Sequence, residues 1–417
     1  MTATNPIIGR CVAVSLVAFS LFAATPLLAE ESAANPLSKV QQRLADGELT
    51  KIVCFGDSIT GVYYHSGSKR AWCDMLGIAL KIAYPNADLQ MINAGRSGHT
   101  TVNALARIDR DVIAKQPQLV IVSFGMNDVA RVPLEDYQRN MREIIRRCQD
   151  GGAKVIVCTP NAVSETEARP EAKLAQYVDA ARSIAAGFKL PLVDLFDQWR
   201  RIRTEDPLGW SLLMSDEIHP NMTGHLRFAE LIGSTISGRP IAFVETPAPL
   251  GTLQVTSDRL ARKETIKLIA APPYDTIVPE ELKRLYPEAK FDLVVWPAKE
   301  QTIAAAAQWA KQIRGLKPHL VIPPLPPQAF AASQDEFIRE YQWVLNYSLP
   351  QSGGAWDVVP ILPLESPNET ARQKKYLGLA SRIIAGKDLL FIGRSPGETR
   401  SANEIVGDWF AGQKQIP

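Results

Sequence analysis

Short β-branched runs alternate with longer segments of helical periodicity along this chain, and this alternation constrains its fold more than any other feature. Five such runs occur in the first half, at 51–55, 89–93, 119–124, 154–159 and 190–195. Between them, segments such as 134–150 place apolar residues at helical spacing with a charged outer face. The pattern predicts an α/β fold: a three-layer α/β/α arrangement around a mostly parallel five-stranded sheet of the flavodoxin-like kind.

The alternation resumes in the second half, after a proline-rich stretch at 238–264 that lacks helical periodicity. Its strand-like runs lie at 267–271, 291–296, 320–323, 357–362 and 389–393. The halves also match in places: QPQLVI at 116–121 aligns with KPHLVI at 317–322, and YPNA at 84–87 aligns with YPEA at 286–289. This similarity favours a diverged duplication. The alternative is that two unrelated βαβ halves resemble each other by composition alone.

The N-terminus has the features of a signal peptide. Arg10 precedes an apolar run at 12–24, and Ala29 is the small residue before an expected cleavage site. The run is too short for a membrane helix, which needs about 20 residues, although an uncleaved anchor is the alternative. We therefore expect a secreted or periplasmic protein with no membrane insertion after cleavage. The expected segments are a signal peptide at 1–29, a first α/β domain at 30–240, a linker or domain edge at 241–264 and a second α/β domain at 265–417.

Composition narrows the class of partner. The chain of 417 residues carries 46 Lys and Arg against 44 Asp and Glu, for a net charge of +2. This balance lacks the basic excess of a nucleic-acid-binding protein. Five cysteines are too few for a disulfide framework. Cys54 and Cys158 lie in strand-like runs, where a free buried thiol is expected. Whether Cys54, Cys73, Cys148 and Cys158 form disulfides stays open.

Polar residues follow the predicted strands in four separate blocks. Gly56-Asp57-Ser58 follows the first strand, Asn93-Ala94-Gly95 the second and Gly125-Met126-Asn127-Asp128 the third, while Asp216-Glu217-Ile218-His219-Pro220 precedes the last helix of the first half. Open α/β sheets keep their ligand sites at the carboxyl ends of their strands. The blocks are therefore expected to meet at one edge of the sheet.

These four blocks resemble the SGNH or GDSL hydrolase family over about residues 51–236. The resemblance implies an esterase or acylhydrolase in which Ser58 is the nucleophile and Asp216 and His219 complete a catalytic triad. It also implies an oxyanion hole formed by Ser58, Gly95 and Asn127. The chemistry agrees, because a serine hydroxyl needs an imidazole to take its proton, and the imidazole needs a carboxylate on its other nitrogen. Backbone N–H groups and a side-chain amide are suitable donors to the oxyanion.

Each of these residues also has a structural interpretation. Ser58 could cap a helix, Asn127 and Asp128 could form an ordinary Asx turn, and His219 could simply precede a helix. A second serine motif at 393–397 fits G-x-S-x-G, but no histidine follows it, as that hydrolase class requires. Metal-ligand spacing is missing, so neither a metal nor another cofactor is expected. The four blocks together favour the catalytic interpretation.

The substrate is less constrained by the sequence. The residues after the expected nucleophile could form a pocket wall that stacks on a sugar: Tyr63, Tyr64 and His65. Asp57 is a further candidate substrate contact. Arg96 could bind an anionic group. Core positions and a solvated arginine are the alternatives. The expected substrate is an acylated carbohydrate, from which short acyl groups, chiefly acetyl, are removed. A lipase, lysophospholipase or thioesterase for longer chains and a non-catalytic carbohydrate-binding protein are the alternatives.

The second half lacks the catalytic residues at the aligned positions. Ser58 aligns with Tyr274 and Asn127 with Gln328, and no histidine follows His319. The second α/β domain is therefore expected to be a degenerate, non-catalytic copy. Packing against the first domain and binding of part of a large substrate are both open as its role.

Overall fold

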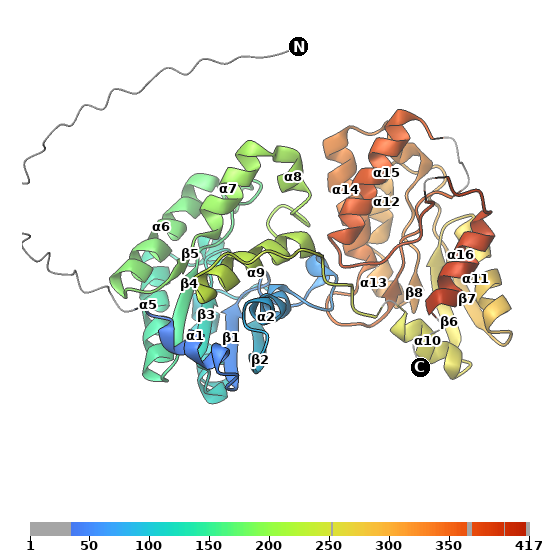
Figure 1. Ribbon diagram of the computed structural model, residues 1–417. Helices are drawn as coiled ribbons and strands as arrows, with labels where there is room; N and C mark the ends of the chain where they lie inside the picture. The colour runs from blue at the N-terminus through green and yellow to red at the C-terminus, as the bar shows by residue number, and fades with distance from the viewer. Residues whose placement is uncertain (1–34, 252, 365–368, 396, 414–417) are drawn as a thin grey trace, which may run out of the picture. The chain divides into compact units, whose positions relative to one another are not determined.

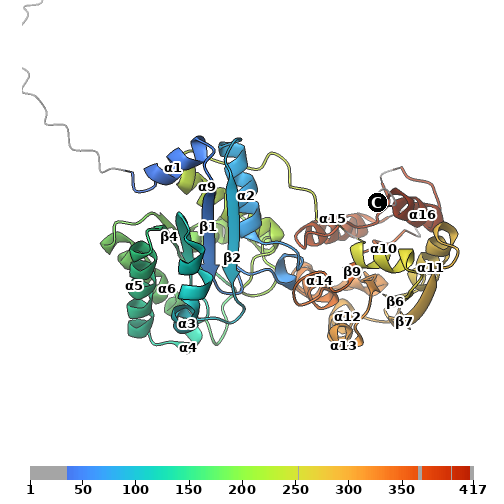
Figure 2. The ribbon, with the colours of Figure 1, turned by 90° about the horizontal axis from the view of Figure 1, so that it is seen from below.

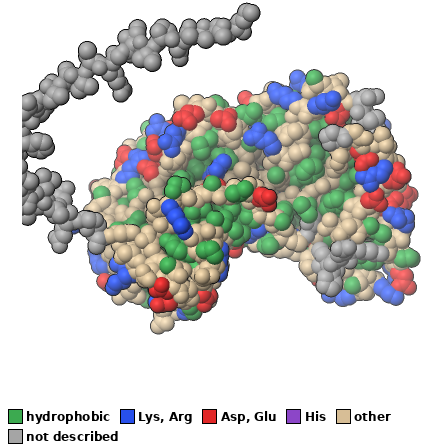
Figure 3. Space-filling model, viewed as in Figure 1, with side chains coloured by type: hydrophobic (Ala, Val, Ile, Leu, Met, Phe, Trp, Pro, Cys, Tyr) green, Lys and Arg blue, Asp and Glu red, His purple; other side chains and the backbone are tan. Residues whose placement is uncertain are grey.

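The computed structural model describes residues 35–413, apart from 252, 365–368 and 396. The predicted signal peptide lies outside these described residues. From Pro36 onward the chain forms one compact unit. Within the described ranges, no helix is both long and apolar enough to span a membrane. Figure 3 shows Lys and Arg side chains interspersed with Asp and Glu over the face in view, in keeping with the balanced composition.

The first half contains a five-stranded sheet whose paired strands are all parallel (Figure 1). The strands run in the order β2-β1-β3-β4-β5, so that β1 lies near the centre. Each of them falls on a predicted strand-like run, which confirms the predicted α/β fold. Their bounds are β1 (Thr50–Gly56), β2 (Leu89–Gly95), β3 (Leu119–Ser123), β4 (Lys154–Cys158) and β5 (Leu192–Val193).

Helices cover both faces of this sheet (Figure 2). One layer consists of α1 (Ser38–Ala45), α2 (Trp72–Ala83) and α9 (Met222–Ser237), and the other of α3 (Thr101–Asp111), α5 (Leu134–Asp150) and α6 (Glu171–Gly187). Shorter elements complete the half: η1 (Tyr64–Ser66), η2 (Ile113–Lys115), α4 (Asp128–Arg131), α7 (Leu195–Glu205) and α8 (Pro207–Ser211). In α5, Tyr137, Met141, Ile144 and Cys148 recur at helical spacing and are buried. The helix coincides with the predicted segment.

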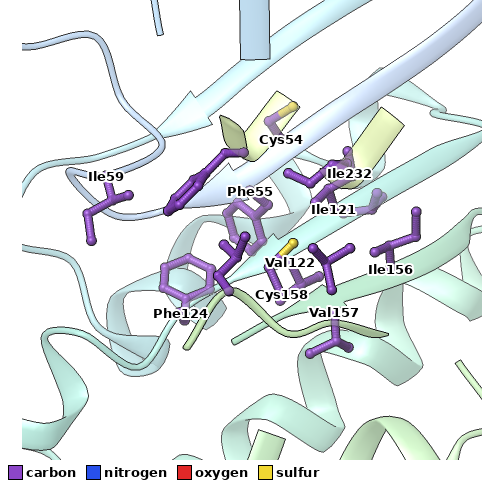
Figure 4. Packing of buried hydrophobic residues seen from close by; sticks show 14 of the residues in the cluster. Cys54, Phe55, Ile59, Ile121, Val122, Phe124, Ile156, Val157, Cys158 and Ile232 are labelled. Atoms are coloured by element: carbon purple, nitrogen blue, oxygen red, sulfur yellow. The ribbon is translucent and has the colours of Figure 1, made fainter. Parts of the chain in front are cut away.

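The first core lies between these layers (Figure 4). Central strands of a parallel sheet are covered on both faces, so they consist of continuous apolar residues. Phe55 on β1 meets Phe124 edge to face, with ring centroids 5.1 Å apart. The four described cysteines are free and buried, as expected for Cys54 and Cys158. They act here as small apolar side chains.

The second half repeats this strand order around a smaller sheet. Its four strands are parallel and run β7-β6-β8-β9, the counterpart of β2-β1-β3-β4. Their bounds are β6 (Thr265–Ala270), β7 (Lys290–Val295), β8 (Leu320–Val321) and β9 (Asp357–Val358). The fifth expected strand, at 389–393, forms only an isolated bridge between Ile361 and Ile392. Pro360 and Pro363 flank that bridge and cannot donate to a ladder, which explains the interruption.

Two helical layers also cover the second sheet. One hydrophobic cluster joins it to α12 (Ile303–Ala310), α13 (Ile313–Leu316), α14 (Gln334–Ser348) and α15 (Ala371–Ala385), with η3 (Pro327–Ala331) alongside. The other cluster contains α10 (Gln254–Ala261), α11 (Tyr274–Leu285) and α16 (Ala402–Gly412). Helix α10 lies inside the stretch 238–264, where no helix is expected. It is held by burial of Leu260 and by the Thr256 N–H, which donates to Asp357 Oδ2 at 2.6 Å.

Backbone geometry is the same at the two pairs of positions that match in sequence. Gln116 and Lys317, each followed by proline, have left-handed φ values of 51° and 50°. Tyr84 and Tyr286 end α2 and α11 with φ and ψ of −133° and 83°, and −133° and 85°. The matching letters therefore mark equivalent turns in the two halves.

Candidate active site

Strand pairing brings the first three polar blocks to one edge of the first sheet. Gly56, the last residue of β1, pairs with Gly95 at the end of β2 and with Ser123 at the end of β3. Because the strands are parallel, their carboxyl ends share this edge. The fourth block reaches it through the loop at 214–220, which we call the acid loop and which joins α8 to α9.

A continuous hydrogen-bonded chain links the three predicted triad residues. Ser58 Oγ lies 2.9 Å from His219 Nε2. On the other side of the ring, His219 Nδ1 lies 2.9 Å from both carboxylate oxygens of Asp216. This is the spacing that proton transfer from a serine hydroxyl to an imidazole requires.

The acid loop fixes its own carboxylate. Asp216 Oδ1 accepts the backbone N–H groups of Ile218, at 2.9 Å, and His219, at 2.8 Å. Burial by itself would raise the pKa of Asp216, but the neighbouring His219 ring and these hydrogen bonds outweigh it and hold the pKa well below its usual range. Asp216 is therefore ionised at neutral pH and orients the imidazole.

Tyr64, predicted as part of a pocket wall, is instead a partner of the acid. Its hydroxyl donates to Asp216 Oδ2 at 3.1 Å. Burial and the adjacent Asp216 charge raise the pKa of Tyr64, so the hydroxyl keeps its proton. On the tyrosine ring lies the guanidinium of Arg314, 5.0 Å from the ring centroid. Tyr64 thus joins the acid to the second half.

His65, also predicted as a wall residue, is buried against the imidazole of His219. Its ring lies parallel to that of His219, with centroids 4.6 Å apart and planes 4° apart. Only 1% of the residue is exposed, so it cannot line a wall. Burial, and then the neighbouring His219, lowers the pKa of His65. The neutral ring donates through Nε2 to the Ser58 carbonyl at 3.0 Å, which fixes the backbone at Ser58.

The other predicted substrate contacts differ in accessibility. Asp57 is buried, and its Oδ1 accepts the Ile59 N–H at 2.9 Å. Burial raises its pKa to about 6. Its carboxylate, in a residue that is only 2% exposed, is engaged within the turn that carries Ser58. Tyr63 is half-buried and its hydroxyl accepts the Ser97 N–H at 2.9 Å, whereas Arg96 is exposed.

The backbone of Gly61 approaches position 95 so closely that only glycine fits there. A Cβ at this position would lie 2.2 Å from the Gly61 nitrogen and 2.6 Å from its Cα, so any larger residue would displace the nucleophile loop. The Gly95 N–H, expected to point at an oxyanion, donates to Asn93 Oδ1 at 2.9 Å. Asn93 also donates through Nδ2 to the Thr60 carbonyl at 2.8 Å. The predicted donor is therefore engaged within its own loop.

Two hydrogen bonds hold the Asn127 side chain and leave one N–H of its amide available. Its Nδ2 donates to the His99 carbonyl at 3.1 Å, and its Oδ1 accepts from Arg169 Nη2 at 3.3 Å. An amide carries two N–H bonds, so one stays available. The backbone N–H of Ser58 also makes no hydrogen bond to any residue that the structure describes.

Arg107 braces the sheet edge and was not singled out by sequence reasoning. It is 5% exposed and donates to the carbonyls of Gly56, at 2.9 Å, and Ala94, at 2.8 Å. An ion pair with Asp111 at 3.0 Å fixes the guanidinium. In the sequence, an arginine on helix α3 looks the same as an exposed surface arginine. The pattern therefore did not predict that Arg107 would bind the strand ends.

Side chains of the second half form hydrogen bonds directly with the acid loop. Asn346 on α14 donates through Nδ2 to the Ser215 carbonyl at 2.9 Å. The Lys387 Nζ donates to Ser215 Oγ and, at 2.6 Å, to Asn346 Oδ1. All three residues are fully buried, and burial lowers the pKa of Lys387 to about 7. Gln342 adds a bond to the Met214 carbonyl at 2.7 Å.

The equivalent positions of the second sheet hold no such constellation. Tyr274, aligned with Ser58, is buried and donates to the Leu362 carbonyl at 3.2 Å while accepting the Leu364 N–H at 3.1 Å. Gln328, aligned with Asn127, is exposed. Across the described part of both halves, no cluster of three or more His, Cys, Asp or Glu residues could bind a metal ion.

Residues 54–227 match the sequence model of the GDSL-like Lipase/Acylhydrolase family. An acetylxylan esterase from Geobacillus stearothermophilus is 26% identical over 210 residues, or 45% of this chain and 93% of that protein. An arylesterase from Vibrio mimicus is 32% identical over 108 residues, or 26% and 52% of the two chains. The crystal structure of a lipase/acylhydrolase from Enterococcus faecalis is 28% identical, with a TM-score of 0.40, and covers 47% of this chain and 100% of that one.

Proposed function

Through residues 54–227 the chain belongs to the GDSL-like lipase/acylhydrolase family of hydrolases that act on ester bonds, and we propose that it is a serine esterase removing short acyl groups, chiefly acetyl, from carbohydrate. The observation that carries the proposal is the hydrogen-bonded chain from Ser58 through His219 to Asp216. The similarity to an acetylxylan esterase supports the acetyl and carbohydrate parts.

In the proposed mechanism, Ser58 Oγ attacks the ester carbonyl carbon while His219 Nε2 takes the hydroxyl proton. Asp216 stabilises the imidazolium that forms. The carbonyl oxygen becomes an anion and accepts from the Ser58 N–H and the remaining N–H of Asn127. Gly95 can contribute only if its N–H is released from Asn93. His219 then gives its proton to the departing alcohol oxygen and leaves an acyl-enzyme.

Water completes the cycle by the same route in reverse. His219 takes a proton from water, which attacks the acyl carbon, and returns a proton to Ser58 Oγ as the carboxylic acid leaves. His65 supports both steps as a rigid platform, because its neutral ring does not add a positive charge next to the imidazolium. The expected signal peptide at 1–29 would place this activity outside the cytoplasm, where acylated polysaccharides occur.

For the second half we propose descent from a duplication, followed by loss of catalysis and retention as a scaffold. Equivalent side-chain contacts support the duplication: the Lys51 N–H donates to Gln118 Oε1 at 2.7 Å, and the Lys267 N–H donates to His319 Nδ1 at 2.8 Å. The shared strand order is further support. The buried bonds to the acid loop support the scaffold role.

Hydrolysis of p-nitrophenyl esters of increasing acyl length tests the function. We expect wild-type protein to cleave the acetyl ester best and Ser58→Ala to have no activity above background on any length. Activity that peaks at long acyl chains would replace the acetyl proposal with a lipase or thioesterase. Activity that persists in Ser58→Ala would refute the serine mechanism.

A further inference from the structure

A groove of about 200 Å³ lies beside the acid loop, and residues from both halves line it. We call it the acid-loop groove. Asp216 and Glu217 come from the loop itself, Trp210 comes from α8 and Trp343 comes from α14. The groove therefore borders the residue that orients the catalytic imidazole.

The lining combines aromatic rings with charged groups. Trp343 is half-buried, and its indole stacks on the Tyr347 ring with centroids 5.0 Å apart and planes 24° apart. Glu217 and Asp335 also line the groove, and within the described ranges neither carboxylate forms a hydrogen bond or ion pair. The guanidinium of Arg339 also lines the groove, is exposed, and pairs with Glu340 at 2.9 Å. Both signs of charge thus flank an indole platform.

This combination matches the two surfaces of a sugar ring. The C–H face of a pyranose is apolar and packs on an aromatic ring, whereas its hydroxyls both donate and accept hydrogen bonds. Carboxylates accept from such hydroxyls and a guanidinium donates to them. An acyl chain would cover the Glu217 and Asp335 carboxylates without donating a hydrogen bond to them, which disfavours a lipid occupant.

The groove is joined rigidly to the triad. Gln342 donates through Nε2 to the carbonyls of Ser211, at 3.0 Å, and Met214, at 2.7 Å, and so pins α14 to the segment that leads into the acid loop. The Arg314 guanidinium lies 6.0 Å from the Tyr347 ring and 5.0 Å from the Tyr64 ring, which contacts Asp216. Packed side chains therefore connect the Trp343 platform with the acid.

We propose that the acid-loop groove is a glycosyl-binding subsite, in which Trp343 stacks on a sugar ring of the acylated carbohydrate and Glu217, Asp335 and Arg339 bind its hydroxyls. The inference rests on the proposed esterase function and extends it, because the second half then selects the substrate while the first half cleaves it. An aryl acetate has no sugar to place in this groove and does not use it.

Steady-state kinetics on two kinds of ester test the subsite. The probes are p-nitrophenyl acetate and a panel of O-acetylated xylo- and cello-oligosaccharides, assayed by acetate release. We expect Trp343→Ala to raise KM at least about tenfold on the best oligosaccharide, equivalent to about 1.4 kcal/mol, and to leave kcat/KM on p-nitrophenyl acetate within about twofold. Trp343→Tyr keeps an aromatic ring and should restore most of the KM.

Trp409→Ala is the matched control, because Trp409 is also a half-buried tryptophan of the second half but packs in the cluster around α11 and α16. It should leave both activities near wild type. Equal losses on both substrates in Trp343→Ala would mean a purely structural role, and unchanged oligosaccharide kinetics would mean that no sugar binds there. Either result overturns the subsite. Failure of the esterase proposal is distinct, since wild-type protein would then lack Ser58-dependent cleavage of p-nitrophenyl acetate.

Discussion

Ser58 and Asn127 should contribute unequally to catalysis, because in the proposed mechanism Ser58 forms the covalent bond and Asn127 donates a single hydrogen bond. We expect Ser58→Ala to lower kcat on p-nitrophenyl acetate by about a million-fold and Asn127→Ala by about a hundred- to a thousand-fold. Melting temperatures should show that both variants stay folded. Full activity in the Asn127→Ala variant would show that the Asn127 amide does not donate to the oxyanion.

Asp57 should make stability depend on pH in the acidic range. Its folded pKa of about 6 lies above the ordinary 3.8, so the folded protein binds the proton more tightly between these values. The stabilisation is full below pH 3.8 and is lost as pH rises through 6. From pH 4 to 7, wild type should therefore lose up to about 3 kcal/mol of unfolding free energy relative to Asp57→Asn. Urea unfolding at both pH values measures this, and parallel profiles would contradict it.

At the residue scale, the sequence located the residues whose chemistry is distinctive. It assigned the wrong surroundings to residues whose role depends on where their side chains point. Ser58, Asp216 and His219 stand in polar blocks at strand ends and come together in the structure. Tyr64 and His65 lie in η1, whose turn points one toward Asp216 and the other beneath His219. No periodicity specifies such directions in a short turn.

Among the elements, the acid loop and α14 are coupled by the buried Lys387. Its folded pKa of about 7 lies below the ordinary 10.5, so the unfolded chain binds the proton more tightly and the unfolding free energy rises with pH between these values. Relative to Lys387→Met, wild type should gain about 2 kcal/mol between pH 7 and pH 9. Urea unfolding of both proteins at the two pH values is the measurement.

The Lys387→Met variant should keep much of its activity, because Ser215 Oγ lies 3.1 Å from Asn346 Oδ1 and donates to it. This bond, and the one from Asn346 Nδ2 to the Ser215 carbonyl, still hold the acid loop. If the difference in stability between the two proteins did not change with pH, Lys387 would not carry a depressed pKa.

Element positions follow the sequence where the hydrophobic pattern is long and uninterrupted. Helix α5 and the strands of the first sheet lie at their predicted positions because burial on regular faces determines them. The run at 389–393 has strand-like composition, but its neighbours Pro360 and Pro363 cannot sustain a ladder. Helix α10 is short and follows the prolines at 247 and 249. It is held by partners about a hundred residues away, such as Asp357.

For the whole molecule, the two sheets form one unit whose halves share buried surface. Tyr64 and Leu212 of the first half pack against the cluster that contains α14 and α15. Arg70 forms a buried bidentate ion pair with Asp388, both bonds being 2.7 Å. Breaking such a buried pair costs about 3–5 kcal/mol. The alternation of strand-like runs predicted the second sheet, but contacts between residues so distant in the chain leave no local pattern.

Truncation after Val244 should therefore abolish activity on small esters as well as on carbohydrate. It leaves Arg70 without its carboxylate, Tyr64 without Arg314 and the acid loop without Asn346. We expect an aggregated or partly unfolded fragment, as judged by gel filtration and circular dichroism. A soluble, folded fragment with wild-type activity on p-nitrophenyl acetate would show that the second half is dispensable for the triad.

Intact-protein mass spectrometry after treatment with a fluorophosphonate tests most directly whether Ser58 is an activated nucleophile. The serine oxygen displaces fluoride and keeps the phosphonyl group, so one adduct per chain is expected on wild-type protein, with the modified peptide containing Ser58. Ser58→Ala should take up none, and His219→Ala should react far more slowly. Labelling of Ser58→Ala at the wild-type rate, or none of the wild-type protein, would contradict the proposed serine mechanism.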